Sequence, residues 1–224
     1  MGYYWRQVRI LLHHAVYDCA RDKLERWPSG RSRTVPADDV VGRQAAFQDR
    51  RYEAFPRLPL LWALDALDLD PATTTFVDYG AGRGRALLAA AGRPFRRCVG
   101  VEFSARLVAE ARDNIAAWPV ERLACRDLSL VHMDAADYVP PPGDLALFFY
   151  NPFGREVLDR VADRLEEAAA DGARKIRIAY VNPRGWALFV GRPAFRRLAI
   201  PRAARAKLAL FGAGPVEFFS VEAP

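Results

Sequence analysis

The chain has 224 residues, enough for one α/β domain with a sizeable core, and 51% hydrophobic with 27% charged residues is an ordinary globular composition. No apolar run approaches the ~20 residues that a membrane span needs, and arginines interrupt the first apolar stretch, so we expect no secretory signal. The three cysteines, Cys19, Cys98 and Cys125, are too scattered for a disulfide framework or a metal cluster. We therefore expect a cytoplasmic, reduced protein without a metal site.

The net charge of +6 is unevenly distributed along the chain. Residues 1–57 hold eleven basic and seven acidic side chains, residues 58–173 hold twelve and eighteen, and residues 174–224 hold ten and two. A basic C-terminal segment could meet nucleic acid, an acidic protein or a membrane surface. Arginine outnumbers lysine thirty to three, which suggests a compositional bias, so a solvated basic face is the simpler interpretation and nucleic acid the less expected partner.

Two regions follow one another along the chain. In residues 3–26 apolar side chains recur at helical spacing, and the polar residues 30–44 predict a surface loop. We expect residues 1–57 to form a helical cap or lid and residues 58–224 to form the main domain. The oligomeric state is left open.

Strands and helices alternate through the main domain. Helices are predicted over residues 60–69, 86–91, 105–117 and 155–170, and strands over residues 76–77, 98–101, 128–133, 145–150 and 175–181. This alternation predicts a parallel, doubly wound sheet. After Pro183 two further strands, residues 195–200 and 215–221, lack a clear crossover helix between them, which predicts an antiparallel hairpin at the sheet edge.

A glycine turn joins the first two strands of this sheet. The first strand ends at Asp78, glycines follow at positions 80, 82 and 84, and the second strand ends at Glu102. This is the pattern of a nucleotide-binding βαβ unit, in which bare peptide and a helix N-terminus face the ligand. A dinucleotide fingerprint would need Gly or Ala at position 85, where Arg85 stands, and the G-K-[ST] of a P-loop is missing.

Polar residues stand at the carboxyl ends of four successive predicted strands. They are Asp78, Glu102, Asp134 and Asn151. Each could be a helix cap on its own, but ligands of open α/β sheets bind at this edge. The four together therefore predict a binding site there.

The spacing D-x-G-x-G-x-G at residues 78–84 resembles motif I of the class I S-adenosylmethionine-dependent methyltransferases. The phrases VDYGAGRGRALLAA, GVEFS, FFYNPF and AYVNP, within residues 50–190, resemble a bacterial Y-N-P-F motif group of that class, distantly similar to histone lysine methyltransferases of the telomeric-silencing-disruptor type. The resemblance implies a Rossmann-like fold with a mostly parallel seven-stranded sheet and a reversed last strand. It also implies S-adenosylmethionine as cofactor and S-adenosylhomocysteine as product.

The resemblance also implies roles for individual residues. Asp78 would lie near the cationic groups of the cofactor, Glu102 would hold its ribose hydroxyls, and Phe103 would lie along the adenine. The remaining cofactor contacts implied are Gly80, Ala81 and Gly82 at the methionine half, Asp134 and Ala135 at the adenine amino group, and Tyr79 and Asn151 beside them. Tyr79 departs from the usual leucine and is expected to point into the sheet.

The segment Asn151-Pro152-Phe153 resembles the N-P-P-[YF] motif of nitrogen methyltransferases, so these three residues are the catalytic candidates. In that motif the Asn side chain and a proline carbonyl accept hydrogen bonds from the amine, and catalysis is largely positioning. Here one proline is missing, which displaces the second carbonyl. The alternative is that Asn151 caps the next helix and Phe153 packs in the core.

These residues lead to a methyltransferase acting on nitrogen, in a protein side chain or a small amine, with the cap completing the acceptor site. Small-molecule O-methylation is the first alternative, although His132 lies within a predicted strand and is expected to be a packed side chain rather than a base. The second alternative is a cofactor- or nucleic-acid-binding protein without turnover. The acceptor itself is not encoded in a recognisable motif.

Overall fold

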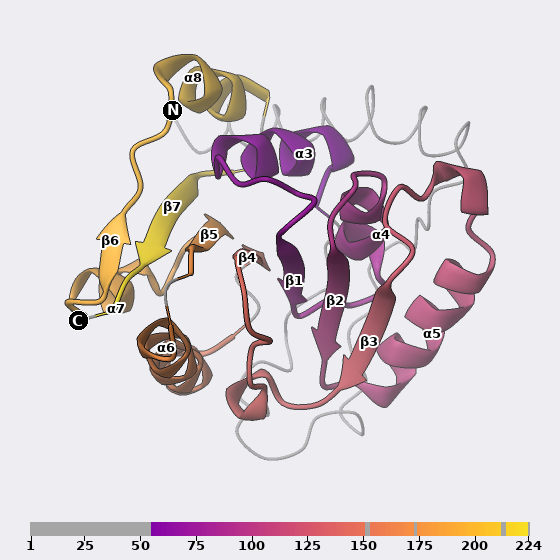
Figure 1. The fold of residues 1–224 in the computed structure, drawn as a ribbon, viewed down its shortest axis with the longest axis horizontal. Coiled ribbons are helices and arrows are strands. Elements are labelled where there is room, and N and C mark those ends of the chain that lie inside the picture. The colour runs from indigo at the N-terminus through magenta and orange to yellow at the C-terminus, as the bar shows by residue number, and fades with distance from the viewer. Residues whose placement is uncertain (1–54, 151–152, 173, 212–213, 224) are drawn as a thin grey trace, which may run out of the picture.

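Seven strands form one twisted sheet in the computed structural model, which describes residues 55–150, 153–172, 174–211 and 214–223 (Figure 1). The strands are β1 (Thr75–Tyr79), β2 (Arg97–Glu102), β3 (Leu128–His132), β4 (Leu145–Tyr150), β5 (Ile176–Val181), β6 (Phe195–Arg197) and β7 (Val216–Val221). Their order across the sheet is β3-β2-β1-β4-β5-β7-β6, and β7 runs antiparallel to both of its neighbours. This confirms the predicted class of fold, including the reversed last strand.

Helices cover both faces of this sheet (Figure 1). They are α3 (Arg57–Ala66), α4 (Arg85–Ala91), α5 (Ala105–Ala116), α6 (Arg155–Ala170), α7 (Trp186–Val190) and α8 (Arg202–Phe211), with short 3₁₀ turns η4 (Val120–Arg122) and η5 (Ala135–Asp137). Helices α6 and α7 share one hydrophobic core with the sheet, whereas α3, α4 and α8 share the core on its other face. Helix α5 packs along β2 and β3, where the side chain of Ser104 caps it by accepting a hydrogen bond from Leu107 N.

The apolar run of β4 explains why this strand lies at the centre of the sheet. Successive side chains point to opposite faces, so a strand without polar residues must be covered on both sides. Phe148 packs against Phe55 on the face of α3, with 5.5 Å between ring centroids, and Phe149 packs against Tyr79 on the face of α6, at 4.9 Å. This central strand holds the two hydrophobic cores together.

The C-terminal part differs from the predicted hairpin. Strands β6 and β7 do pair antiparallel, but helix α8 connects them and packs on α3. Leu208 is buried in that contact, and the ammonium group of Lys207 lies 4.1 Å from the ring centroid of Trp62. The alanine-rich sequence of α8 has high helix propensity, which the emphasis on its basic residues had obscured.

Most of the predicted N-terminal cap, including Cys19, lies outside the described residues. The described part of this region, from Phe55 to Arg57, leads directly into α3. Cys98 and Cys125 are both buried, in keeping with small apolar roles. Among the described helices none is both long and apolar enough to cross a membrane.

Tyr79 at the end of β1 lies in the core between the sheet and α6, as expected from its direction. Its side chain is 1% exposed, and its ring contacts those of Phe149, Tyr138 and Phe153. The hydroxyl oxygen has no hydrogen-bond partner. A buried hydroxyl in this state costs stability, because folding removes its bonds to water without replacement.

We expect Tyr79→Phe to raise the free energy of unfolding by about 1 kcal/mol, because it removes the unpartnered hydroxyl and keeps the ring contacts. Urea denaturation measures this change. Tyr180→Phe is the matched control: Tyr180 is equally buried, but its hydroxyl accepts a hydrogen bond from Gly185 N at 3.4 Å, so its removal should destabilise the protein. A loss of stability in both variants would mean that the Tyr79 hydroxyl has a partner in solution.

Candidate functional site

The glycine turn after β1 folds back over the end of β2. The amides of Gly80 and Ala81 both donate hydrogen bonds to the Val101 carbonyl, at 2.9 and 3.0 Å. Gly80, Gly82 and Gly84 have φ values of 81°, 53° and 78°, in the left-handed region that side chains disfavour. The alternation of glycines therefore follows from the backbone path of the turn.

Gly100 in β2 is where the turn comes closest to the sheet. A Cβ atom at this position would lie 2.9 Å from Ala81 Cβ and 2.9 Å from Leu130 Cδ2. Only a glycine allows the turn to rest directly on β2. The sequence analysis gave this residue no role, although a glycine inside an apolar strand often marks a close approach.

The Glu102 carboxylate fixes the turn from the other side. Its Oε2 accepts a hydrogen bond from Gly82 N at 2.8 Å, and its Oε1 accepts one from Ser104 N at 3.0 Å. The side chain is 4% exposed. Burial raises the pKa of Glu102, while the amides of Ser104, Gly82 and Phe103 and the charge of His132 act in the opposite direction. Sequence reasoning assigned Ser104 only as a helix cap, but its amide also holds this acid.

Asp78 is the second buried acid, one strand away from Glu102. It is 3% exposed, and none of the described residues donates a hydrogen bond to its carboxylate. Burial, and secondarily the charge of Glu102, raises the pKa of Asp78 to about 8. A buried acid without a donor favours a cationic partner, since a positive charge would offset the loss of hydration.

The tips of β2 and β3 bring together the residues assigned to the adenine half. Phe103 is half-buried directly after β2, and Asp134 accepts a hydrogen bond from Ala136 N at 2.9 Å, beside the buried Ala135. His132 was expected to be packed, but it is exposed, because β3 is the edge strand. Its Nε2 lies 2.9 Å from the Phe103 carbonyl oxygen.

Of the catalytic candidates, Asn151 and Pro152 lie outside the described residues. Phe153 is 7% exposed and packs edge-on against Tyr79 and Phe149, with 6.3 Å between ring centroids in both pairs. On the neighbouring strand, Asn182 follows β5 with φ of 47°, and a Cβ at Gly214 would lie 2.6 Å from its Oδ1. The sequence analysis gave Asn182 no role, because its left-handed backbone conformation is visible only in the structure.

The arrangement offers carboxylates and backbone amides but no metal site. No group of three or more His, Cys, Asp or Glu side chains that could hold a metal occurs within the described part of the chain. All described site residues lie at the carboxyl edge of the parallel strands, with Tyr79 extending from that edge into the core.

No protein-family model and no curated protein matches the sequence. Among solved structures, the pyocyanin biosynthetic protein PhzM is 18% identical, with a TM-score of 0.50 over 73% of this chain and 55% of that chain. The 23S rRNA methyltransferase ErmE is 16% identical, with a TM-score of 0.47 over 75% of this chain and 68% of that chain. The glycopeptide N-methyltransferase MtfA, complexed with S-adenosylmethionine, is 13% identical, with a TM-score of 0.48 over 74% of this chain and 94% of that chain. At these identities the likeness to PhzM is one of fold alone, and it covers the seven-stranded sheet described above.

The raised pKa of Asp78 makes stability depend on pH. The folded protein keeps the Asp78 proton up to about pH 8, whereas the unfolded chain loses it near the ordinary value of 3.8. The folded state therefore binds the extra proton between these values, and the stability that Asp78 contributes, complete below pH 4, is lost as the pH rises to 8. We expect the melting temperature of the wild type to fall between pH 5 and 8 more steeply than that of Asp78→Asn.

Thermal unfolding at several pH values, without added ligand, measures the difference. The exposed Asp113 supplies the control variant Asp113→Asn, which should follow the wild-type curve. Parallel curves for wild type and Asp78→Asn would show that Asp78 is ionised in the folded protein.

Proposed function

We propose that the protein is a methyltransferase that uses S-adenosylmethionine and transfers the methyl group to a nitrogen, in a protein side chain or a small amine. The observation that carries this proposal is the buried carboxylate of Asp78 near Glu102, to which none of the described residues donates a hydrogen bond. S-adenosylmethionine carries an ammonium and a sulfonium, so this acid fits the cationic groups of its methionine half.

The glycine turn itself disfavours a phosphate ligand. The amides of Gly80, Ala81 and Gly82, which would bind a pyrophosphate, already donate to the Val101 carbonyl and to the Glu102 carboxylate. Arg85, which occupies the third position of the dinucleotide fingerprint, does not compensate, because its side chain is buried and its Nε donates to the Phe55 carbonyl at 3.3 Å. The fit is therefore better for a nucleoside without phosphates than for NAD.

The residues at the strand tips would divide the binding of the cofactor among them. Glu102 would accept hydrogen bonds from the ribose hydroxyls, which compete for the oxygens that now accept from Gly82 and Ser104. Phe103 would lie along the adenine, while Asp134 and the Ala135 amide would bind its edge. When bound, the cofactor supplies an electrophilic methyl group for direct transfer.

Asn151, Pro152 and Phe153 would position the acceptor nitrogen. Phe153, packed on Tyr79 and Phe149, gives this segment a rigid base at the end of β4. The N-terminal segment, residues 1–57, would close the acceptor side as a cap over the domain formed by residues 58–224. An amine needs positioning rather than deprotonation, and positioning is the role proposed for this segment.

Glu102→Gln should weaken S-adenosylmethionine binding by roughly 10- to 100-fold, because a neutral amide replaces a charge-assisted acceptor of the ribose hydroxyls. Isothermal titration of S-adenosylmethionine and of NAD into both proteins measures the effect. The exposed Glu121 provides the matched control, Glu121→Gln, which should bind as the wild type does. Failure of the folded wild type to bind S-adenosylmethionine, or tighter binding of NAD, would refute the proposed cofactor.

Asn151→Ala should lower the rate of methyl transfer by about 100-fold, far more than it lowers the affinity for the cofactor, because it removes a group that aims the acceptor. Transfer of labelled methyl groups to a panel of amines, phenols and proteins, with products identified by mass spectrometry, measures this. Methyl groups found on oxygen would replace the nitrogen assignment by O-methylation, and an unchanged rate in the variant would remove Asn151 from the mechanism.

A further inference from the structure

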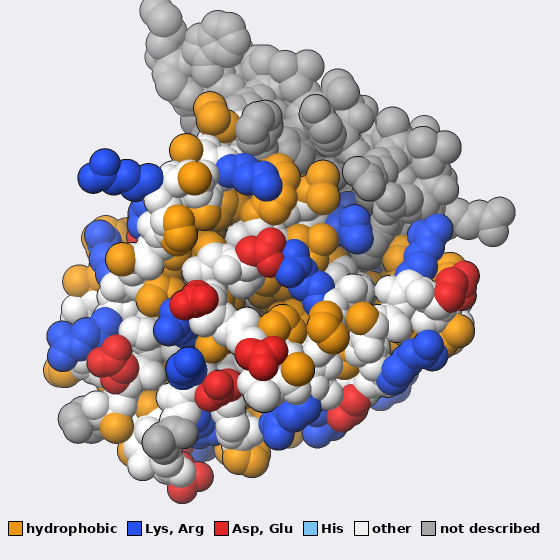
Figure 2. Space-filling model, turned by 45° about the horizontal axis from the view of Figure 1, so that its top comes forward, with side chains coloured by type: hydrophobic (Ala, Val, Ile, Leu, Met, Phe, Trp, Pro, Cys, Tyr) orange, Lys and Arg blue, Asp and Glu red, His pale blue; other side chains and the backbone are white. Residues whose placement is uncertain are grey.

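A basic edge surface lies at the end of the sheet formed by β6 and α8. We define it by five exposed cations, Arg184, Arg197, Arg202, Arg205 and Lys207. They come from the turn after β5, from the edge strand β6 and from α8. Lysine and arginine side chains recur along the left border of the molecule in Figure 2, the side on which α8 and β6 lie in Figure 1.

Among the described residues, no acid pairs with these five cations. None of them forms an ion pair with a described residue. Residues 174–224 contain only two acids, Glu217 and Glu222, and Glu222 lies 3.6 Å from Arg196. By contrast, Arg192 in the same region pairs with acids of α6. The charge of the basic edge surface is therefore available to an anionic partner.

Two indole rings are interleaved with these cations. The Arg197 guanidinium carbon lies 4.6 Å from the ring centroid of Trp186, and the Lys207 ammonium lies 4.1 Å from that of Trp62. The Trp186 side chain is 39% exposed at the start of α7, five residues after β5 ends. A cation that packs on an indole holds both side chains in place without covering the ring completely. The basic edge surface thus combines fixed positive charge with an exposed aromatic ring.

We propose that the basic edge surface binds single-stranded nucleic acid, with phosphates on the arginines and lysine and a base stacked on Trp186. Channels for single strands combine cations that follow the backbone with aromatic rings that stack on bases. A membrane surface would also attract the charge, but it favours large apolar side chains beside the cations. Over residues 202–210, the exposed side of α8 instead carries Ala203, Ala206 and Ala209, and Leu210 is the one large apolar side chain exposed there.

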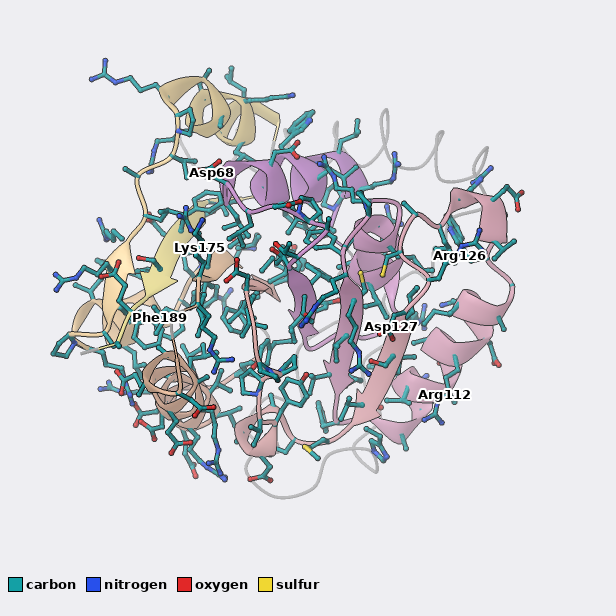
Figure 3. The ribbon with its side chains drawn as sticks, in the orientation of Figure 1. Asp68, Arg112, Arg126, Asp127, Lys175 and Phe189 are labelled. Carbon is teal, nitrogen blue, oxygen red and sulfur yellow. The ribbon has the colours of Figure 1, made fainter. Side chains whose placement is uncertain are left out.

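Fluorescence anisotropy with a labelled, mixed-sequence RNA of about 20 nucleotides, and with the DNA of the same sequence, tests the proposal at several salt concentrations. Five phosphate contacts at ~0.7 released counterions each predict a slope of log affinity against log salt of about −3.5. Arg197→Glu/Arg205→Glu should weaken binding at least tenfold and make the slope shallower. The matched control is Arg112→Glu/Arg126→Glu, two exposed arginines on the opposite side of the molecule (Figure 3), which should bind within about twofold of the wild type.

Trp186→Leu tests the stacking separately, since it should weaken binding by roughly tenfold while the salt slope stays the same. Melting temperatures show that each variant is folded, and Arg197→Gln/Arg205→Gln, which removes charge without reversing it, should give an intermediate loss. Equal losses in both Glu pairs, or binding to vesicles with 30% anionic lipid but not to RNA or DNA, would overturn the proposal. All titrations omit the cofactor, so their failure leaves the proposed methyl transfer untouched.

Discussion

The structure of the site depends on the Glu102 carboxylate, which joins three segments of the chain. It accepts from Gly82 in the turn after β1 and from Ser104 at the start of α5, and it belongs to the end of β2. Gly100 also contributes, because the absence of a side chain at this position lets Ala81 in the turn pack directly on β2. The buried Glu102 carboxylate and the glycine at position 100 therefore fix the turn in the ligand-free protein, so the surface that a ligand would contact is preorganised.

Glu102 and Asp78 are both buried acids, but they differ in how their charge is compensated. Two amides stabilise the charged form of Glu102, whereas Asp78 has no donor and its pKa rises to about 8. Burial of Asp78 destabilises the ligand-free protein, and a bound cationic ligand would remove this destabilisation. A buried acid without hydrogen-bond donors says more about a ligand than a buried acid with donors. Packing alone would favour an apolar residue in the position of the first.

The sequence predicted the sheet well where one residue pattern determines both local structure and packing. The apolar run of β4 and the acid–glycine–acid order at residues 78–102 are such cases, since each has a single structural consequence. The sequence-based prediction was wrong where the position of a residue in the sheet determines its environment. His132 is exposed because β3 is an edge strand, and helix α8 forms between β6 and β7 because Leu208 packs against α3. Neither edge position nor packing partner is visible in a local pattern.

The uneven charge along the chain corresponds to the two parts of the sheet. Strands β1 to β4 run parallel and lie within residues 58–173, the segment that has an excess of acidic residues and that contains the acids of the candidate site. Strands β5, β6 and β7, with α8, lie within the final 51 positions, where basic residues outnumber acids ten to two. Cation binding and anion binding are mutually unfavourable at short range, so a protein that does both benefits from placing them on different parts of one rigid sheet. The segment from Asn182 to Trp186 connects the carboxyl edge of the parallel strands to the basic edge surface, because it begins at the carboxyl end of β5 and ends at the indole of that surface.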